Sequence, residues 1–148
     1  MMTVFNFYDT CSLLLKADYL FENDENIVIS SITLEELENI KTSASKGPDV
    51  KAAARKVTRA LELNNEKYTL EVYYSSYEKD ITKLNLPVTN DTKILACAKR
   101  FAATHKHDIM YFVTNDLACK HLAKLFIDDS YITSFYEAPY TYEGFEEV

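Results

Sequence analysis

Short apolar runs alternate with helical segments along the chain, and this alternation limits the possible folds most. Residues 109–113, IMYFV, are almost wholly apolar, which is typical of a strand covered on both faces of a parallel sheet. Residues 3–8 and 27–29 are further β-branched or aromatic runs, each followed by helical apolar spacing. Strands that alternate with helices indicate parallel βαβ units. We therefore expect an α/β three-layer sandwich with a central, mainly parallel sheet of four or five strands flanked by helices.

The remaining segments are assigned by the same reasoning. Residues 42–49, TSASKGPD, predict a loop, residues 75–86 are ambiguous, and residues 137–148 predict a poorly ordered acidic tail. We expect a single domain over residues 1–136. Further helices are predicted over residues 13–21, 34–42, 50–63, 91–104 and 117–126, and further strands over residues 69–74 and 131–136.

Composition excludes several classes of function. The net charge of −7 argues against broad binding of phosphate backbones, although bound cations can invert the charge of an acidic site locally. With only two glycines, the chain has neither a G-x-G-x-x-G fingerprint nor a Walker A loop, so we expect no nucleotide cofactor. No apolar run reaches the roughly 18 residues that span a bilayer. We therefore expect a cytoplasmic protein without membrane contact.

The cysteines do not predict a metal site or a disulfide framework. Their number is odd and no C-x-x-C pair occurs among Cys11, Cys97 and Cys119. All three fall in predicted helices, where we expect small buried residues.

Four acidic residues stand where a strand or turn passes into a helix: Asp9, Glu36, Asp91 and Asp116. The carboxyl ends of parallel strands meet in one crevice, so these side chains are expected to converge. Converging carboxylates repel one another unless protons or cations neutralise them. Since hard divalent cations prefer oxygen ligands, the sequence predicts a divalent-metal site.

Each acid also has a purely structural interpretation. Asp91, or its neighbour Asn90, can cap the helix that begins there, and Asp116 can cap the helix that follows it. Glu36 follows Thr33 by three residues, the spacing of a capping box. For Asp9, which ends an apolar run, the functional interpretation is stronger.

Four short motifs surround these acids: D-T-x-x-L-L from Asp9, T-x-x-E-L from Thr33, D-x-x-I-x-A-x-A from Asp91, and V-T-N-D ending at Asp116. In this order the motifs resemble the PIN domain family, a compact α/β nuclease fold, over nearly the whole chain. The sequence LEELENIK and the ending YTYEGFEEV look most like the PIN domains associated with PhoH-type ATPases. Cys11 departs from the family pattern, which commonly has Asn or Ser there.

This resemblance implies a metal-dependent nuclease that uses Mg²⁺ or Mn²⁺, usually on single-stranded RNA, with DNA possible. It implies that Asp9, Glu36, Asp91 and Asp116 are both catalytic and metal-binding, with Asp9 and Asp116 as direct ligands. It further implies that Thr10, Thr114 and Asn115 donate hydrogen bonds that orient the carboxylates. Lys51, Arg55, Lys93 and Lys120 are candidate contacts to substrate phosphates, although each is equally well explained as a solvated helix charge.

Two alternative functions are weighed against the nuclease. The first is a catalytically weak PIN scaffold that binds RNA or protein, with a toxin-like ribonuclease held by a protein inhibitor as its variant. The second, a receiver domain, is disfavoured, because adjacent acids near the first strand are missing. A homodimer is plausible from the resemblance alone. We expect no catalytic role for His105 or His107, while Tyr73, Tyr74 and Tyr77 are candidates for base stacking.

Overall fold

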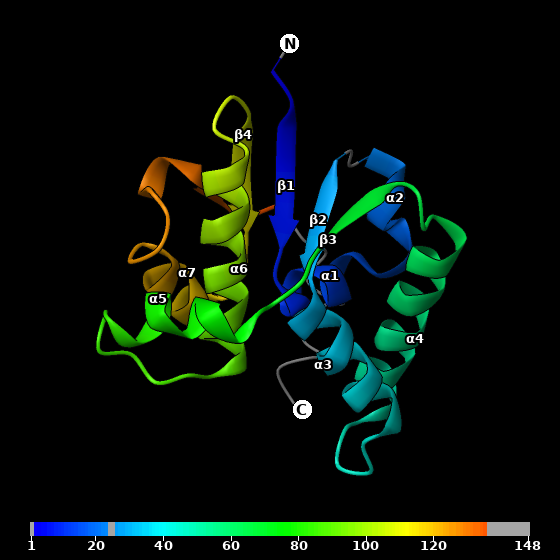
Figure 1. The fold of residues 1–148 in the computed structure, drawn as a ribbon. Helices are drawn as coiled ribbons and strands as arrows, with labels where there is room; N and C mark the ends of the chain where they lie inside the picture. The colour runs from blue at the N-terminus through cyan, green and yellow to red at the C-terminus, as the bar shows by residue number, and fades with distance from the viewer. Residues whose placement is uncertain (1, 24–25, 136–148) are drawn as a thin grey trace.

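The computed structural model describes residues 2–23 and 26–135, which form a parallel five-stranded sheet between two layers of helices (Figure 1). The strand order is β3-β2-β1-β4-β5, and every pairing is parallel. This arrangement confirms the predicted α/β three-layer sandwich. The strands are β1 (Val4–Tyr8), β2 (Ile27–Ser30), β3 (Tyr68–Glu71), β4 (Ile109–Val113) and β5 (Ile132–Thr133).

Helices connect the strands and cover both faces of the sheet. The α-helices are α1 (Thr10–Lys16), α2 (Leu20–Asn23), α3 (Ser31–Thr42), α4 (Pro48–Leu63), α5 (Glu78–Thr82), α6 (Asn90–Thr104) and α7 (Leu117–Ala123). Three short 3-10 helices complete the described part: η1 (Ala17–Tyr19), η2 (Ser75–Tyr77) and η3 (Asp129–Tyr131). No helix in this part of the chain is long and apolar enough to cross a membrane.

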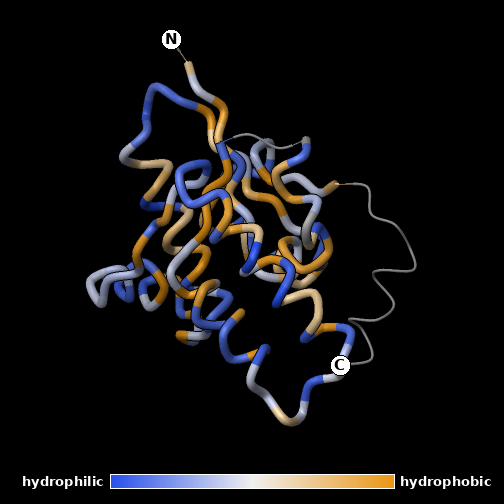
Figure 2. The backbone as a smooth tube through the Cα atoms, turned by 90° about the vertical axis from the view of Figure 1, so that its right-hand side faces the viewer, coloured by the Kyte–Doolittle hydropathy of each residue, from blue (hydrophilic) through white to orange (hydrophobic). Residues whose placement is uncertain are grey.

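Two hydrophobic cores hold the layers together, one on each face of the sheet. On one face, Ile29 of β2 packs with buried residues of α1, α3 and α4. On the other, Phe7 and Phe112 pack against Phe101 of α6 and against residues of α5 and α7. Figure 2 shows the hydrophobic strand segments running through the middle of the molecule. Since both faces are covered, β4 is almost wholly apolar, as the run at residues 109–113 indicated.

The strand order reverses beside β1, and this reversal fixes which residues meet at the carboxyl end of the sheet. The chain passes from β1 to β2 and β3 toward one edge and then returns to place β4 on the other side of β1. Ligands of open α/β sheets bind at such a reversal. Tyr8 is in register with Val113, so the residues that follow them, Asp9 and Thr114, leave the sheet side by side. All strands end at the lower side of Figure 1, where α1, α3, α6 and α7 begin.

Several predicted boundaries were wrong, and a hydrogen bond explains one of them while a backbone angle explains another. The strand predicted over residues 69–74 ends at Glu71, because the backbone N–H of Tyr73 donates to Ser31 Oγ (2.9 Å) instead of continuing the ladder. The helix predicted over residues 13–21 begins at Thr10 and is interrupted at Ala17, where φ is 51°. The ambiguous residues 75–86 contain η2 and α5. Within the strand predicted over residues 131–136, residues 132–133 form β5. The predicted tail, residues 137–148, lies outside the described residues.

The ion pair between Asp80 and Arg100 generates a stability prediction. Replacing Arg100 by Ala should lower the free energy of unfolding by roughly 1–2 kcal/mol, because the largely buried Asp80 carboxylate would keep only Lys83, at 4.0 Å. Urea unfolding measures this change. The control Lys41→Ala removes an ion pair with Glu38, whose side chain is 60% exposed, and should cost less than about 0.5 kcal/mol. Equal losses in the two variants would contradict the prediction.

Candidate functional site

Asp9 lies at the end of β1 with its carboxylate held from two sides. Its Oδ1 accepts from the backbone N–H of Ser12 (2.8 Å) as the N-cap of α1, and its Oδ2 accepts from Thr114 Oγ1 (2.6 Å). The residue is only 5% exposed. Burial raises the pKa of Asp9 above its usual value, the hydrogen bonds from Thr114 and Ser12 lower it, and the nearby Asp116 charge raises it further. The carboxylate is thus buried, held in one orientation by two hydrogen bonds, and destabilised in its ionised form by burial and by the charge of Asp116.

Glu36 projects from α3 and contacts two other segments of the site. Thr10 Oγ1 donates to its Oε1 (2.6 Å), and Asn90 Nδ2 donates to its Oε2 (3.3 Å). The capping box proposed between Thr33 and Glu36 is wrong, because the N-cap of α3 is Ser30, which accepts from the backbone N–H of Thr33. Glu36 is therefore not used to start its own helix. Its partners come from the beginnings of α1 and α6.

Asp91 is the second residue of α6, and the proposal that it or Asn90 caps this helix is also wrong. Thr89 is the N-cap, and it forms a reciprocal capping box with Thr92. Asp91 is exposed. Loss of surrounding water raises the pKa of Asp91, and the Asp116 charge raises it further. Capping therefore does not explain Asp91, although its place in the first turn of α6 suits a negative charge.

Asp116, at the end of β4, does cap the helix that follows. Its Oδ1 accepts from the backbone N–H groups of Ala118 (2.9 Å) and Cys119 (3.4 Å) at the start of α7. Its own backbone N–H donates to Thr114 Oγ1 (3.2 Å), the same hydroxyl that donates to Asp9. Thr114 thereby links the two acids that flank the strand-order reversal.

The charges of Asp9, Glu36, Asp91 and Asp116 interact so that each acid repels two of the others, and we call these four residues the charge ring. The Asp116 charge raises the pKa of both Asp9 and Asp91, and the charges of Asp91 and Asp9 in turn raise the pKa of Glu36, after burial as the first cause in each case. All four charges also act on Cys11. Partial loss of surrounding water and then the four charges raise the pKa of its thiol to about 12. Four segments distant in sequence thus meet at one edge of the sheet.

The donor chemistry of the ring fits a divalent cation. Carboxylate oxygens are the preferred ligands of Mg²⁺, and a cation would offset both the burial and the repulsion that raise these pKa values. Within residues 2–23 and 26–135, no three His, Cys, Asp or Glu side chains stand close enough to form a ready-made metal cage. Mg²⁺ commonly uses one or two protein carboxylates and keeps several waters, so it does not require such a cage.

The other predicted site residues take different positions. Thr10 and Thr114 donate to Glu36 and Asp9, whereas Asn115 exchanges two hydrogen bonds with the backbone of Phe135. Lys93 lies over the ring of Tyr73 (5.5 Å). Lys120 donates to Ser134 Oγ (3.0 Å), and Lys51 and Arg55 lie on α4.

The remaining sequence predictions concern the three cysteines, His105 and the contacts of Glu36. Cys97 and Cys119 are buried as expected, but Cys11 is exposed, so the prediction for it was wrong. His105 stacks on Phe101 (3.8 Å between ring centroids) just past the end of α6, the end opposite to Asp91. Asn90 was missed as a contact of Glu36, since only the packing of α6 beside α3 brings the two together.

Comparison with known proteins identifies the family. The model of the PIN domain matches residues 7–126, most of the chain. The chain belongs to the PIN domain family. PIN domains are generally nucleases, so membership supports nuclease activity here, while the expected association with PhoH-type ATPases stays a prediction.

A solved structure supports the fold of this PIN domain. The crystal structure of VapBC2 from Rickettsia felis bound to a DNA fragment from their promoter is similar, with a TM-score of 0.51 and 14% sequence identity. The similarity covers 90% of this chain and 100% of that one. No significant match was found among curated proteins. At this identity the similarity demonstrates the fold alone.

The charge ring generates a prediction about pH. Asp91→Asn should raise the Tm of the metal-free protein at neutral pH by about 1–3 °C, a small gain because Asp91 is exposed. Since its pKa is raised in the folded state, ionised Asp91 destabilises the fold as pH rises from about 3.8 through the raised pKa. The gain should therefore disappear at lower pH. Thermal unfolding across this pH range measures it.

Asp49→Asn is the matched control, because Asp49 is likewise the second residue of a helix, α4, but lies outside the ring. It should lose a little helix-dipole stabilisation and show no gain at neutral pH. A gain of the same size at Asp49 would show that repulsion within the ring is not the cause.

Proposed function

We propose that this PIN domain is a divalent-metal-dependent nuclease that hydrolyses phosphodiester bonds, with single-stranded RNA as its substrate and Mg²⁺ or Mn²⁺ as its cofactor. The observation that carries the proposal is the ring of four mutually repelling carboxylates at the strand-order reversal. A fold gains no stability from such an arrangement in the absence of cations. Function is the better explanation for it.

The four acids would divide the work according to their positions. Asp9 and Asp116 follow the adjacent strands β1 and β4 and share the Thr114 hydroxyl, so we assign them as direct ligands. Asp91 adds charge beside Asp116, and Glu36 would bind a second ion or orient the attacking water. When bound, the cation lowers the pKa of a water nucleophile and offsets charge on the phosphoryl oxygens.

Contacts to the substrate backbone require cations from the protein, because the ring itself repels phosphates. Lys93 is two residues from Asp91 on α6, and Lys120 lies on α7, four residues after Asp116. We assign these two as the nearest phosphate contacts. Lys51 and Arg55 on α4 would contact substrate phosphates farther from the four acids.

A second candidate function is a catalytically weak binding module, possible also as a toxin-like protein with a protein inhibitor. The observation that favours it is the lack of a ready-made cage of three metal ligands in the described residues. Cleavage assays separate the two candidates, because a binding module would not lose activity on loss of an acid.

Substitution in the ring is the direct test of hydrolysis. Asp9→Asn and Glu36→Gln should each lower the rate of Mn²⁺-dependent cleavage of a labelled single-stranded RNA by about 100-fold or more, because each removes a charge that holds an ion. Glu35→Gln, at the exposed neighbour of Glu36, should leave the rate unchanged. Equal rates in all variants, or no cleavage by the wild type with Mn²⁺, would favour the binding module.

Metal binding can be tested without any activity. Adding Mn²⁺ should stabilise the wild type against thermal unfolding, by about 2.7 kcal/mol at 100 times the dissociation constant. Asp116→Asn should lose most of this stabilisation, since it removes a proposed ligand but keeps an oxygen for the cap of α7. Asp49→Asn should keep all of it. Equal stabilisation of Asp116→Asn and the wild type would argue against a metal at the ring.

A further inference from the structure

Tyr73, Tyr74 and Tyr77 form a cluster directly after β3, at the same carboxyl end of the sheet as the four acids. The ring of Tyr77 makes edge contacts with those of Tyr73 and Tyr74, each with centroids 5.7 Å apart. Tyr74 is the most exposed member, with 58% of its surface exposed, while Tyr73 and Tyr77 are partly buried. Tyr74 is thus an exposed aromatic ring that rests against the ring of Tyr77, which in turn contacts Tyr73.

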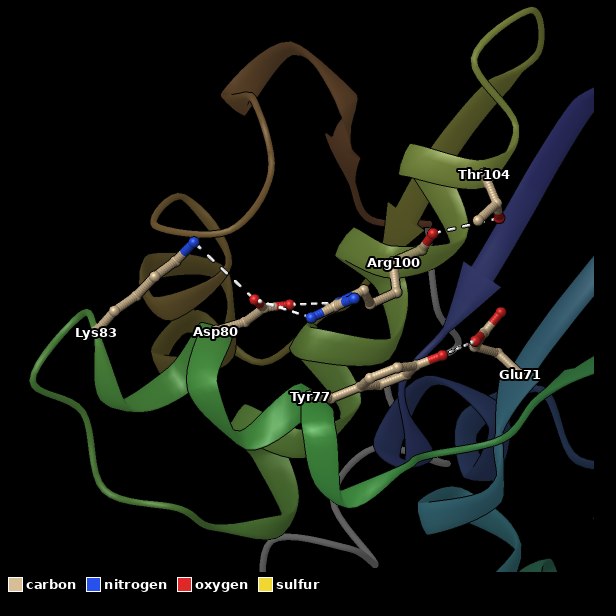
Figure 3. A network of polar contacts seen from close by, with 6 residues as sticks. All are labelled: Glu71, Tyr77, Asp80, Lys83, Arg100 and Thr104. Atoms are coloured by element: carbon tan, nitrogen blue, oxygen red, sulfur yellow. Dashed lines mark hydrogen bonds and ion pairs between the residues drawn. The ribbon is translucent and has the colours of Figure 1, made fainter.

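A polar network keeps the cluster in place (Figure 3). Arg100 on α6 binds Asp80 of α5 through two hydrogen bonds, Nε to Oδ2 (2.7 Å) and Nη2 to Oδ1 (3.3 Å). The same guanidinium lies over the ring of Tyr77 at 4.8 Å. The Tyr77 hydroxyl donates to Glu71 Oε2 at the end of β3 (3.0 Å). The ring that supports Tyr74 is therefore fixed from both sides before any ligand arrives.

Two short paths connect the cluster to the charge ring. Along the first, the Tyr73 backbone N–H donates to Ser31 Oγ, and Ser31 begins the helix that carries Glu36 about 7.5 Å farther along its axis. Along the second, Glu36 accepts from Asn90, and Lys93, less than one helical turn onward, lies over the ring of Tyr73. The tyrosines and the acids thus share both α3 and α6.

We propose that Tyr74 is a stacking platform for one unpaired base of the nucleic acid strand whose phosphate is cleaved at the ring. Lys93, between the tyrosines and Asp91, contacts the phosphate that joins the stacked nucleotide to the cleaved one. This inference rests on the proposed function and adds the position that selects single-stranded substrate, because a base within a duplex cannot turn its face onto a side chain.

The chemistry of the cluster favours a base over a protein side chain. Stacking on an exposed aromatic ring tolerates any base, since every base has a π-face, and it contributes to affinity without a deep pocket. The neighbouring cation suits a phosphate, because Lys93 lies over the ring of Tyr73 and stands two residues from Asp91 on the same helix, α6. An apolar protein segment would gain nothing from Lys93 beside it.

The test measures binding separately from cleavage. Fluorescence anisotropy gives the dissociation constant of a short phosphorothioate RNA strand, which resists hydrolysis, in the presence of Mg²⁺. Tyr74→Ala should weaken binding about tenfold, whereas Tyr74→Phe should bind like the wild type because it keeps the aromatic face. Tyr19→Ala is the matched control, since Tyr19 is 63% exposed on η1, outside the cluster, and should change nothing.

A series of RNAs, each lacking one base, completes a double-mutant cycle. One position should weaken wild-type binding about as much as Tyr74→Ala does, and the variant should be insensitive to loss of that same base. If no position weakens wild-type binding, or if Tyr74→Ala binds like Tyr19→Ala, the platform is refuted, even where the wild type cleaves RNA. Tyr74-dependent binding without any cleavage would support the platform and refute the nuclease instead.

Discussion

The hydrogen bond from Thr114 to the buried carboxylate of Asp9 is the contact on which the arrangement of the site depends. It joins the residues that follow β1 and β4, the two strands between which the strand order reverses. The same hydroxyl accepts from the backbone of Asp116, so one threonine sets the relative position of two acids. A charge-assisted hydrogen bond of this kind is short and directional, which suits a group that must orient a carboxylate.

Around this contact, carboxylates that repel one another lower the stability of the fold. Each helix that begins at the site has a local cap: Asp9 for α1, Ser30 for α3, Thr89 for α6 and Asp116 for α7. Glu36 and Asp91 cap no helix, and burial together with the charges of other carboxylates raises the pKa of each. Stability given up at one place is typical of functional sites.

The sequence predicted the sheet and the convergence of acids for physical reasons that can be named. An apolar run such as residues 109–113 has few alternatives to a strand buried on both faces, and parallel strands bring their carboxyl ends together. The caps were harder, because Ser30, Thr33 and Glu36 offer competing oxygens, and only the packing of Thr10 and Asn90 against Glu36 decides between them. The network of Asp80 and Arg100 was not foreseeable, since it depends on how α5 docks on α6.

The span of sequence between Asp9 and Asp116 has a consequence for a chain still emerging from the ribosome. Synthesis of β1, β2 and β3 with their helices comes first, but β4 is needed before Asp116 can approach Asp9. Contacts of such long sequence separation form late, because the connecting loop must close first. A nascent or truncated chain that lacks β4 therefore cannot bring the four acids together, so any activity that needs all of them begins only when the domain is nearly complete.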